Sequence, residues 1–149
     1  MTEIFFYKLK NLSIELFLIS LIEKSISKNW NSLVLLDNIE RMEEINDLMW
    51  TFNDTSFIPH GSQSDLNPDK HNVYLTCSEE NLNNSNIIFS IDGIIINQPD
   101  NWKRCIYIFN EQNLKVTDEL ESYKRGIEDL NYDLKSFEQD NNGKWISNN

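Results

Sequence analysis

Two kinds of hydrophobic pattern alternate along the first fifty residues. Continuous apolar or aromatic runs at 4–9 and 32–36 predict strands, the second typical of a strand buried on both faces of a parallel sheet. Apolar residues recur every three or four positions over 12–28 and again between Asp37 and Trp50, which predicts two helices. Asp37, with Glu40 three residues later, is a candidate capping box for the second helix. The residues expected to face inward from this helix are Ile39, Met42, Ile45, Leu48 and Met49.

The middle of the chain has a different pattern. Residues 52–70 contain two prolines, a glycine and several small polar residues, which predicts a long loop. Further strands are expected at 72–77, 87–91 and 105–109. A helical stripe then follows, formed by Val116, Leu120, Tyr123, Ile127 and Leu130.

Two interpretations of the C-terminal residues are open. The helical stepping can continue through Leu134 and Phe137, or the helix can end near Asn131 and be followed by a short hairpin. The sequence Asn142-Gly143 favours the hairpin, because this dipeptide fits the tight turns that join antiparallel strands.

These elements predict a single α/β domain over residues 1–149. We expect a mostly parallel central sheet flanked by helices, with a C-terminal helix and a short hairpin. No apolar run approaches the roughly 18–20 residues of a membrane-spanning helix. The start Met1-Thr2-Glu3 is acidic and does not fit a secretory signal, so we expect a cytoplasmic protein.

Charge and motifs exclude several function classes. Thirteen basic against 24 acidic residues give a net charge of −11, which argues against strong, direct nucleic-acid binding but allows a small basic pocket. The turn after the first strand, 10–13, contains no glycine, so the nucleotide-binding-like topology lacks the phosphate site. His60 and His71 lack metal-ligand spacing, and Cys77 and Cys105 fit buried thiols better than a disulfide or a metal site. We therefore expect no catalytic residues, no cofactor and no metal.

Two groups of aromatic residues are candidate binding sites. Trp50 ends the second helix, and Phe52 and Phe57 follow in the polar loop; they either complete the edge of the core or anchor a partner protein. Tyr123-Lys124-Arg125, together with Lys115, Lys144 and Trp145, forms a basic-aromatic group. Either its cations face water while the tyrosine packs inward, or it is a pocket for a chain end that carries carboxylates.

A family resemblance rests on motifs spread over essentially the whole chain. The most specific is Trp50-Thr51-Phe52 followed by Ser56-Phe57-Ile58-Pro59-His60-Gly61. Others are Phe6-Tyr7, the runs 72–76 and 87–89, Ile91-Asp92-Gly93 and residues 140–145. In these features the sequence resembles the chi subunit (HolC family) of the bacterial DNA polymerase III holoenzyme. The resemblance implies a non-catalytic accessory subunit in DNA replication. Such a subunit is part of a nucleotidyltransferase only because it belongs to the DNA-directed DNA polymerase complex.

The resemblance also implies partners. Chi proteins link the clamp loader, through a psi subunit or an equivalent, to the acidic tail of single-stranded-DNA-binding protein. The family motifs assign tail binding to Lys115, Tyr123, Lys124 and Arg125. They assign the partner-subunit face to Trp50, Phe52 and Phe57.

The sequence departs from the family pattern in the last predicted helix. Family members carry arginines before the aromatic residue and another basic residue after it. This chain has Leu120, Glu121 and Ser122, then Ile127 and Glu128, while Arg125 is a candidate substitute. The alternative function is an adaptor for a helicase or clamp-loader protein through the Trp50/Phe57 face, with tail binding lost or weakened.

Overall fold

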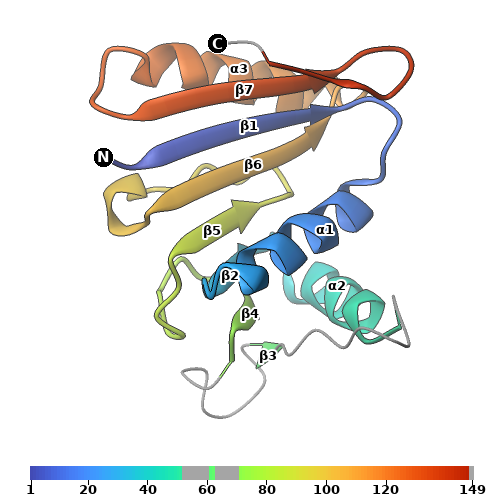
Figure 1. The fold of residues 1–149 in the computed structure, drawn as a ribbon, viewed down its shortest axis with the longest axis vertical. Coiled ribbons are helices and arrows are strands. Elements are labelled where there is room, and N and C mark those ends of the chain that lie inside the picture. Colours follow the sequence, from blue (N-terminus) through green and yellow to red (C-terminus); the bar gives the residue numbers. More distant parts are fainter. Residues whose placement is uncertain (52–60, 63–70, 148–149) are drawn as a thin grey trace.

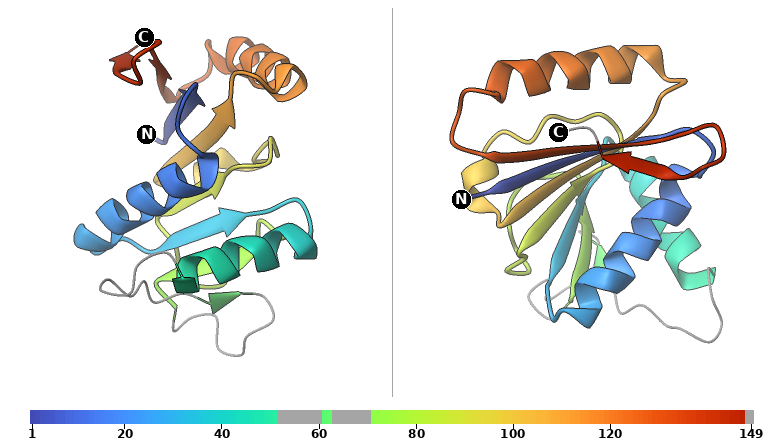
Figure 2. Two further views of the ribbon diagram at one scale, coloured as in Figure 1. Left: turned by 90° about the vertical axis from the view of Figure 1, so that its right-hand side faces the viewer. Right: turned by 45° about the horizontal axis from the view of Figure 1, so that its top comes forward.

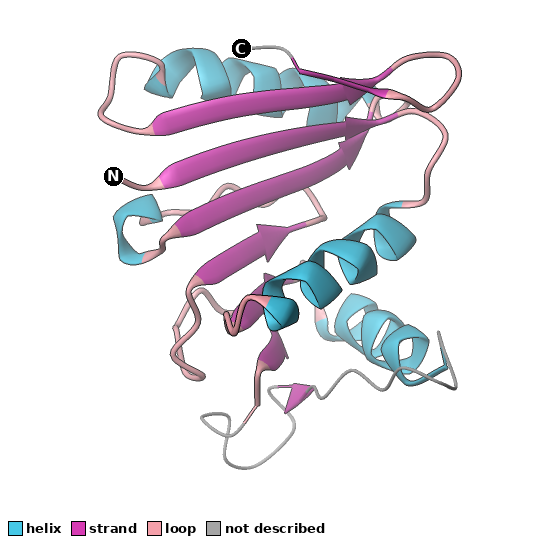
Figure 3. Cartoon of the chain, viewed as in Figure 1, coloured by secondary structure: helices cyan, strands magenta, loops and turns pink. Residues whose placement is uncertain are grey.

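A single, mostly parallel sheet organises the described part of the chain (Figures 1 and 3). The structure is a computed structural model that describes residues 1–51, 61–62 and 71–147. The elements are β1 (Glu3–Leu9), α1 (Ile14–Ser27), β2 (Ser32–Leu35), α2 (Ile39–Thr51), β3 (Gly61–Ser62), β4 (Val73–Thr76), β5 (Ile87–Ser90), a 3-10 turn (Pro99–Asn101), β6 (Arg104–Asn110), α3 (Leu114–Ile127), β7 (Asp133–Gln139) and β8 (Trp145–Ser147). The α/β fold class is thereby confirmed.

The strand order is β3-β4-β2-β5-β6-β1-β7-β8. All neighbouring strands are parallel except β8, which is antiparallel to β7. Strand β1 therefore lies inside the sheet, between β6 and β7, while β2 lies between β4 and β5. Because both strands have neighbours on two sides and helices above or below, their apolar character is continuous rather than alternating.

Helices cover the two faces of the sheet (Figure 2). On one face, α1 and α2 bury a cluster that includes Phe5, Ile22, Val34 and Met42. On the other face, α3 and the segment after β5 bury Ile4, Phe6, Tyr107 and Leu120, among others. Alternation along β1 places Phe5 and Phe6 in different layers, so one strand contributes to both cores. None of the helices in the described ranges is long and apolar enough to cross a membrane.

Two details of α2 correct the sequence prediction. The helix is capped by Asn38, whose Oδ1 accepts a 2.8 Å hydrogen bond from the backbone N–H of Arg41, and not by Asp37. The helix consequently begins one residue later, and Ile39 in its first turn is 55% exposed instead of facing inward. Met42, Ile45 and Met49 are buried as predicted.

The hairpin interpretation of the C-terminal residues is confirmed. Helix α3 ends at Ile127, and β7 and β8 pair as antiparallel strands around a turn at Asp140–Lys144. Leu130, predicted to extend the helical stripe, follows the helix and is exposed. The sequence did not reveal that β7 also pairs in parallel with β1 over six residues, which makes it a full strand of the central sheet.

Candidate functional site

Helix α3 places the predicted basic-aromatic group against the sheet. Its N-cap, Asn113, accepts a hydrogen bond from the backbone N–H of Val116, and its apolar stripe packs on β1 and β6. The Tyr123 ring lies 6.4 Å from that of Phe6 and 5.7 Å from that of Tyr107, between ring centroids. Burial raises the pKa of the Tyr123 hydroxyl. The tyrosine therefore packs inward as a half-buried part of the core.

Lys124 lies beside this tyrosine in a small cavity of about 140 Å³. Its Nζ donates a 2.8 Å hydrogen bond to Ser136 Oγ on β7 and lies 5.8 Å from the centre of the Phe6 ring. A carboxylate oxygen of Glu121, one turn earlier, lies 3.6 Å from the same Nζ. The other Glu121 oxygen lies 3.4 Å from Lys8 Nζ, which is also 3.6 Å from Glu138. Two cations and two carboxylates thus share the cavity, which is close to neutral overall.

Sequence reasoning missed the polar strand residues of this cavity, among them Lys8 and Ser136. Both come from strands, and only the parallel pairing of β1 with β7 brings them under α3. The one available signal for Lys8 is the alternation of side chains between the two faces of β1, which places Lys8 on the same face as Phe6.

The structure does not bring all four predicted tail-binding residues together. Lys115 and Lys124 are nine residues apart on one helix, which at 100° per residue places them on opposite sides, about 14 Å apart along the axis. Lys115 and Arg125 are exposed, whereas Lys124 is half-buried. A single bound carboxylate can therefore contact Lys124 or Arg125 but not Lys115 as well.

The suggestion that Trp145 backs the α3 group is wrong. Its ring packs on the opposite face of the sheet, 5.1 Å from Phe17 and 5.5 Å from Tyr7 between centroids. The β7–β8 turn is held against the loop between β1 and α1 by Gln139, whose Oε1 accepts hydrogen bonds from the backbone N–H groups of Lys10 and Asn11 at 2.8 and 3.2 Å. This docking aims Trp145 at α1.

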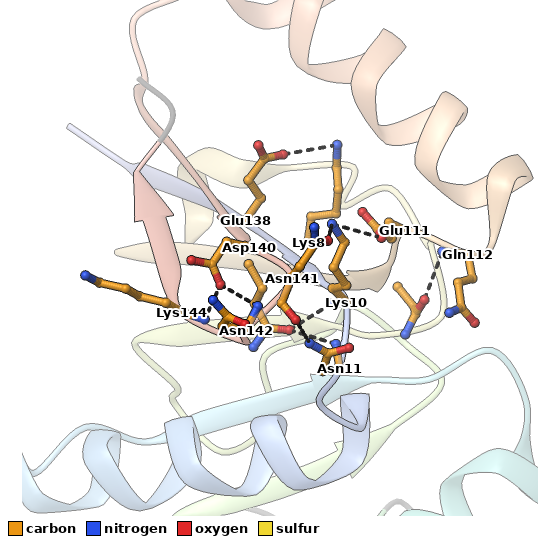
Figure 4. A network of polar contacts seen from close by, with 12 residues as sticks. Lys8, Lys10, Asn11, Glu111, Gln112, Glu138, Asp140, Asn141, Asn142 and Lys144 are labelled. Atoms are coloured by element: carbon orange, nitrogen blue, oxygen red, sulfur yellow. Dashed lines mark hydrogen bonds and ion pairs between the residues drawn. The ribbon is translucent and has the colours of Figure 1, made fainter.

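The polar network around the same turn is shown in Figure 4. Asp140 Oδ1 accepts from the backbone N–H groups of Asn142 and Lys144, at 2.8 and 2.9 Å, and so shapes the turn itself. Lys10 Nζ donates a 2.9 Å hydrogen bond to Asn141 Oδ1, while the Lys144 side chain points away from these groups. Lys144 therefore remains an exposed cation at the tip of the hairpin.

The predicted partner face is only partly described. Trp50 lies in the last turn of α2 and is 53% exposed, although neighbouring Met49 is buried. Exposure of a tryptophan on a helix end fits a protein-binding anchor. Phe52 and Phe57 lie outside the described residues, as does His60.

A cleft of about 390 Å³ lies where doubly wound sheets bind nucleotides, at the carboxyl ends of the strands. Arg41 on its wall is bound by carboxylates: its Nη2 lies 2.9 Å from Glu15 Oε1, its Nε 3.0 Å from Asp92 and its Nη1 3.2 Å from Glu44. These acids hold the only cation lining the cleft in the described part of the chain.

The helix N-termini at this cleft are also already occupied. Ser13, Asn38 and Asn113 each accept a hydrogen bond from an amide in the first turn of α1, α2 and α3, respectively. These are donors that a phosphate group uses at such a site. Among residues 1–51, 61–62 and 71–147, no group of three or more His, Cys, Asp or Glu side chains is arranged to hold a metal ion.

Comparisons with known proteins agree on one family. Residues 1–134 match the sequence model of the family described as "DNA polymerase III chi subunit, HolC". A curated relative from Rickettsia prowazekii (strain Madrid E), described as "Probable DNA polymerase III subunit chi", is 33% identical over 128 residues. The alignment covers 84% of this chain and 77% of the relative.

Proposed function

The chain belongs to the DNA polymerase III chi subunit family, and we propose that it acts in replication as a non-catalytic connector between proteins. The observation that carries the proposal is the family match over residues 1–134. The cleft at the carboxyl ends of the strands supports it, because its arginine and its helix N-termini are bound by the protein's own groups. A cytoplasmic location is part of the proposal.

The first connection that we propose is to the acidic C-terminal tail of single-stranded-DNA-binding protein, on the α3 side. Lys124 and exposed Arg125 supply the cations, and Phe6, against which the Tyr123 ring packs, supplies the aromatic wall. Glu121 already pairs with both lysines of the cavity, so the carboxylates of the tail must compete with it. We expect weak, salt-sensitive binding.

Isothermal titration calorimetry tests this connection. The titrant is a peptide copying the C-terminal tail of the same organism's single-stranded-DNA-binding protein, at two salt concentrations. Charge-assisted hydrogen bonds contribute about 1.5–3 kcal/mol each, so Lys124→Ala or Arg125→Ala should weaken binding about tenfold or more. Lys115→Ala, on the far side of α3 from Lys124, is the matched control. Unchanged affinity in both test variants would reject this pocket.

The second connection that we propose is to the clamp loader, through psi or an equivalent, by the face that includes Trp50, Phe52 and Phe57. Its support is the exposure of Trp50 at the end of α2. A helicase or another clamp-loader protein on this face, with tail binding lost, is the alternative.

Affinity capture from lysate separates these possibilities. Trp50→Ala/Phe57→Ala should lose clamp-loader proteins, whereas Leu16→Ala, which removes an exposed apolar side chain from α1, should retain them. Recovery of a helicase in place of clamp-loader proteins, lost in the same double variant, would favour the alternative. Identical partners for the double variant and wild type would reject the face.

A further inference from the structure

A compact group of cations surrounds Trp30, at the amino ends of the strands and on the α1 face of the sheet. Three of them lie over the Trp30 ring: Arg104 at 5.0 Å, and Lys28 and Lys103 at 5.6 Å each from its centre. Lys135 on β7 lies 5.6 Å from the centre of the neighbouring Phe5 ring, over which Arg104 also lies at 4.6 Å. The group is therefore assembled from the residue that follows α1, the start of β6 and β7, which are distant in sequence.

A cavity of about 150 Å³ opens beside these cations. Its wall includes the apolar side chains of Leu21, Ile87 and Ile106, while Lys24, Lys28 and Arg104 supply its charge. This volume suits one apolar side chain, with a cationic rim around it. An apolar pocket inside a charged rim is typical of sites that bind a short peptide segment.

The charge of this group is unusual for the molecule. Lys24, Lys28, Lys103, Arg104 and Lys135 are five of thirteen basic residues in a chain of net charge −11. Of these five residues, only Arg104 forms an ion pair within the described ranges, with Glu3 at 2.9 Å. Asp133 lies next to Glu3 in the sheet register, so a second acid is placed at this end of the sheet. The helix dipole accounts for Lys24 and Lys28 at the end of α1, but not for the cations of β6 and β7.

From this arrangement we propose that the Trp30 group binds an acidic peptide segment of a partner protein, with one apolar residue of the segment in the cavity. The group is on the opposite face of the sheet from α3, so the inference is independent of the tail site proposed above. Single-stranded nucleic acid fits less well. Three cations already lie over the ring where a base would stack, and the net charge of −11 repels a long polyanion.

Fluorescence anisotropy tests the proposal on the full chain. The probe is a fluorescein-labelled ten-residue peptide of aspartates around one central phenylalanine. We expect salt-sensitive binding that Lys28→Glu/Lys103→Glu weakens at least about tenfold, since both exposed lysines then repel the peptide. Lys115→Glu/Lys144→Glu makes the same change of charge at two other exposed positions and should leave the affinity within about twofold. Circular dichroism checks that each variant is folded.

The other outcomes each overturn the proposal. Equal weakening by both double variants means general attraction of charge without a site. Weakening only by Lys115→Glu/Lys144→Glu places the binding of the peptide at those two positions and not at the Trp30 group. Tighter binding of an oligothymidylate than of the peptide, lost in Lys28→Glu/Lys103→Glu, makes the group a nucleic-acid site. No detectable binding of the peptide removes the site altogether.

Discussion

Lys124 Nζ donates a 2.8 Å hydrogen bond to Ser136 Oγ, which joins α3 to β7 across the mouth of the candidate tail pocket. The same ammonium group lies 3.6 Å from Glu121, and Glu121 also pairs with Lys8. Exposed or half-exposed ion pairs of this kind contribute at most about 1 kcal/mol to stability. Their larger effect here is on charge, because Glu121 is shared by the two cations that face the pocket and, together with Glu138, offsets their charge.

Removal of the Glu121 charge should therefore strengthen the binding of an acidic tail. In Glu121→Gln, Lys8 and Lys124 lose their shared counter-ion, and we expect the affinity for the tail peptide to rise about threefold to tenfold at low salt. Titration calorimetry measures the change. Glu119→Gln, an exposed carboxylate on the same helix, is the matched control and should change the affinity less than twofold. An equal gain in both variants would show that only net charge matters.

The composition of this pocket shows which of its residues can be predicted from the sequence and which cannot. The helical stripe through Leu120 and Tyr123 correctly predicts which side of α3 packs on the sheet. It says nothing of Lys8 or Ser136, because a parallel pairing between residues 130 positions apart leaves no local pattern. Trp145 illustrates the same limit, since its facing depends on how the hairpin docks against Lys10 and Asn11.

The Arg41–Glu15 ion pair predicts a pH-dependent part of stability. Although burial opposes it, hydrogen bonds from the backbone N–H of Glu15, from Arg41 and from Ser13 hold the pKa of this carboxyl below its usual 4.5. A carboxyl with a lowered pKa in the folded state stabilises the fold above the unfolded value of 4.5. That contribution is lost as the pH falls through the folded value.

Glu15→Gln should thus be less stable than wild type at pH 7, by about 0.5–1 kcal/mol after allowance for solvent screening. The difference should shrink as the pH falls below 4.5 and disappear once wild type has lost the same charge. Urea denaturation at several pH values measures it. Glu23→Gln, exposed on the same helix and without an ion pair in the described ranges, should match wild type at every pH. A Glu15→Gln deficit that is constant with pH would contradict the assignment.

The two cysteines should differ in reactivity. Burial raises the pKa of Cys105 to about 12, with smaller contributions from Glu79 and Asp100. Cys77, which directly follows β4, is only partly buried, although burial and nearby Asp37 and Asp92 raise its pKa too. Titration with a thiol reagent at pH 8 should label one cysteine in the native protein and two in denaturant. Labelling that persists in native Cys77→Ser would contradict this difference.

Much of the fold follows from local pattern, and the exceptions have identifiable causes. Runs such as 32–36 and 105–109 predict β2 and β6 because strands buried on both faces are apolar throughout. The spacing of Ile39 fits the stripe of α2 and predicts a core position, yet capping by Asn38 places it in an exposed first turn. Periodicity cannot detect where a helix begins when two adjacent residues, Asp37 and Asn38, are both good caps.

Gly61 and Gly126 should respond in opposite ways to the same substitution. A Cβ added at Gly61 would lie 2.4 Å from Cδ2 of the His71 ring, so Gly61→Ala requires this half-buried side chain to move. We expect a loss of about 1–3 kcal/mol, typical of overpacking. At Gly126, inside α3, the added Cβ would have no atom within 4 Å apart from its neighbouring residues and the adjoining backbone of the helix. Gly126→Ala should stabilise the protein by about 0.5–1 kcal/mol, since alanine is the better helix former.

Thermal unfolding measures both effects, at about 2–4 °C per kcal/mol for a domain of this size. The double variant Gly61→Ala/His71→Ala identifies the cause, because removal of the ring should relieve the clash and make the alanine at 61 less costly than in the presence of His71. A cost of Gly61→Ala that is the same with and without the ring would show that the backbone at Gly61, rather than the His71 contact, requires glycine.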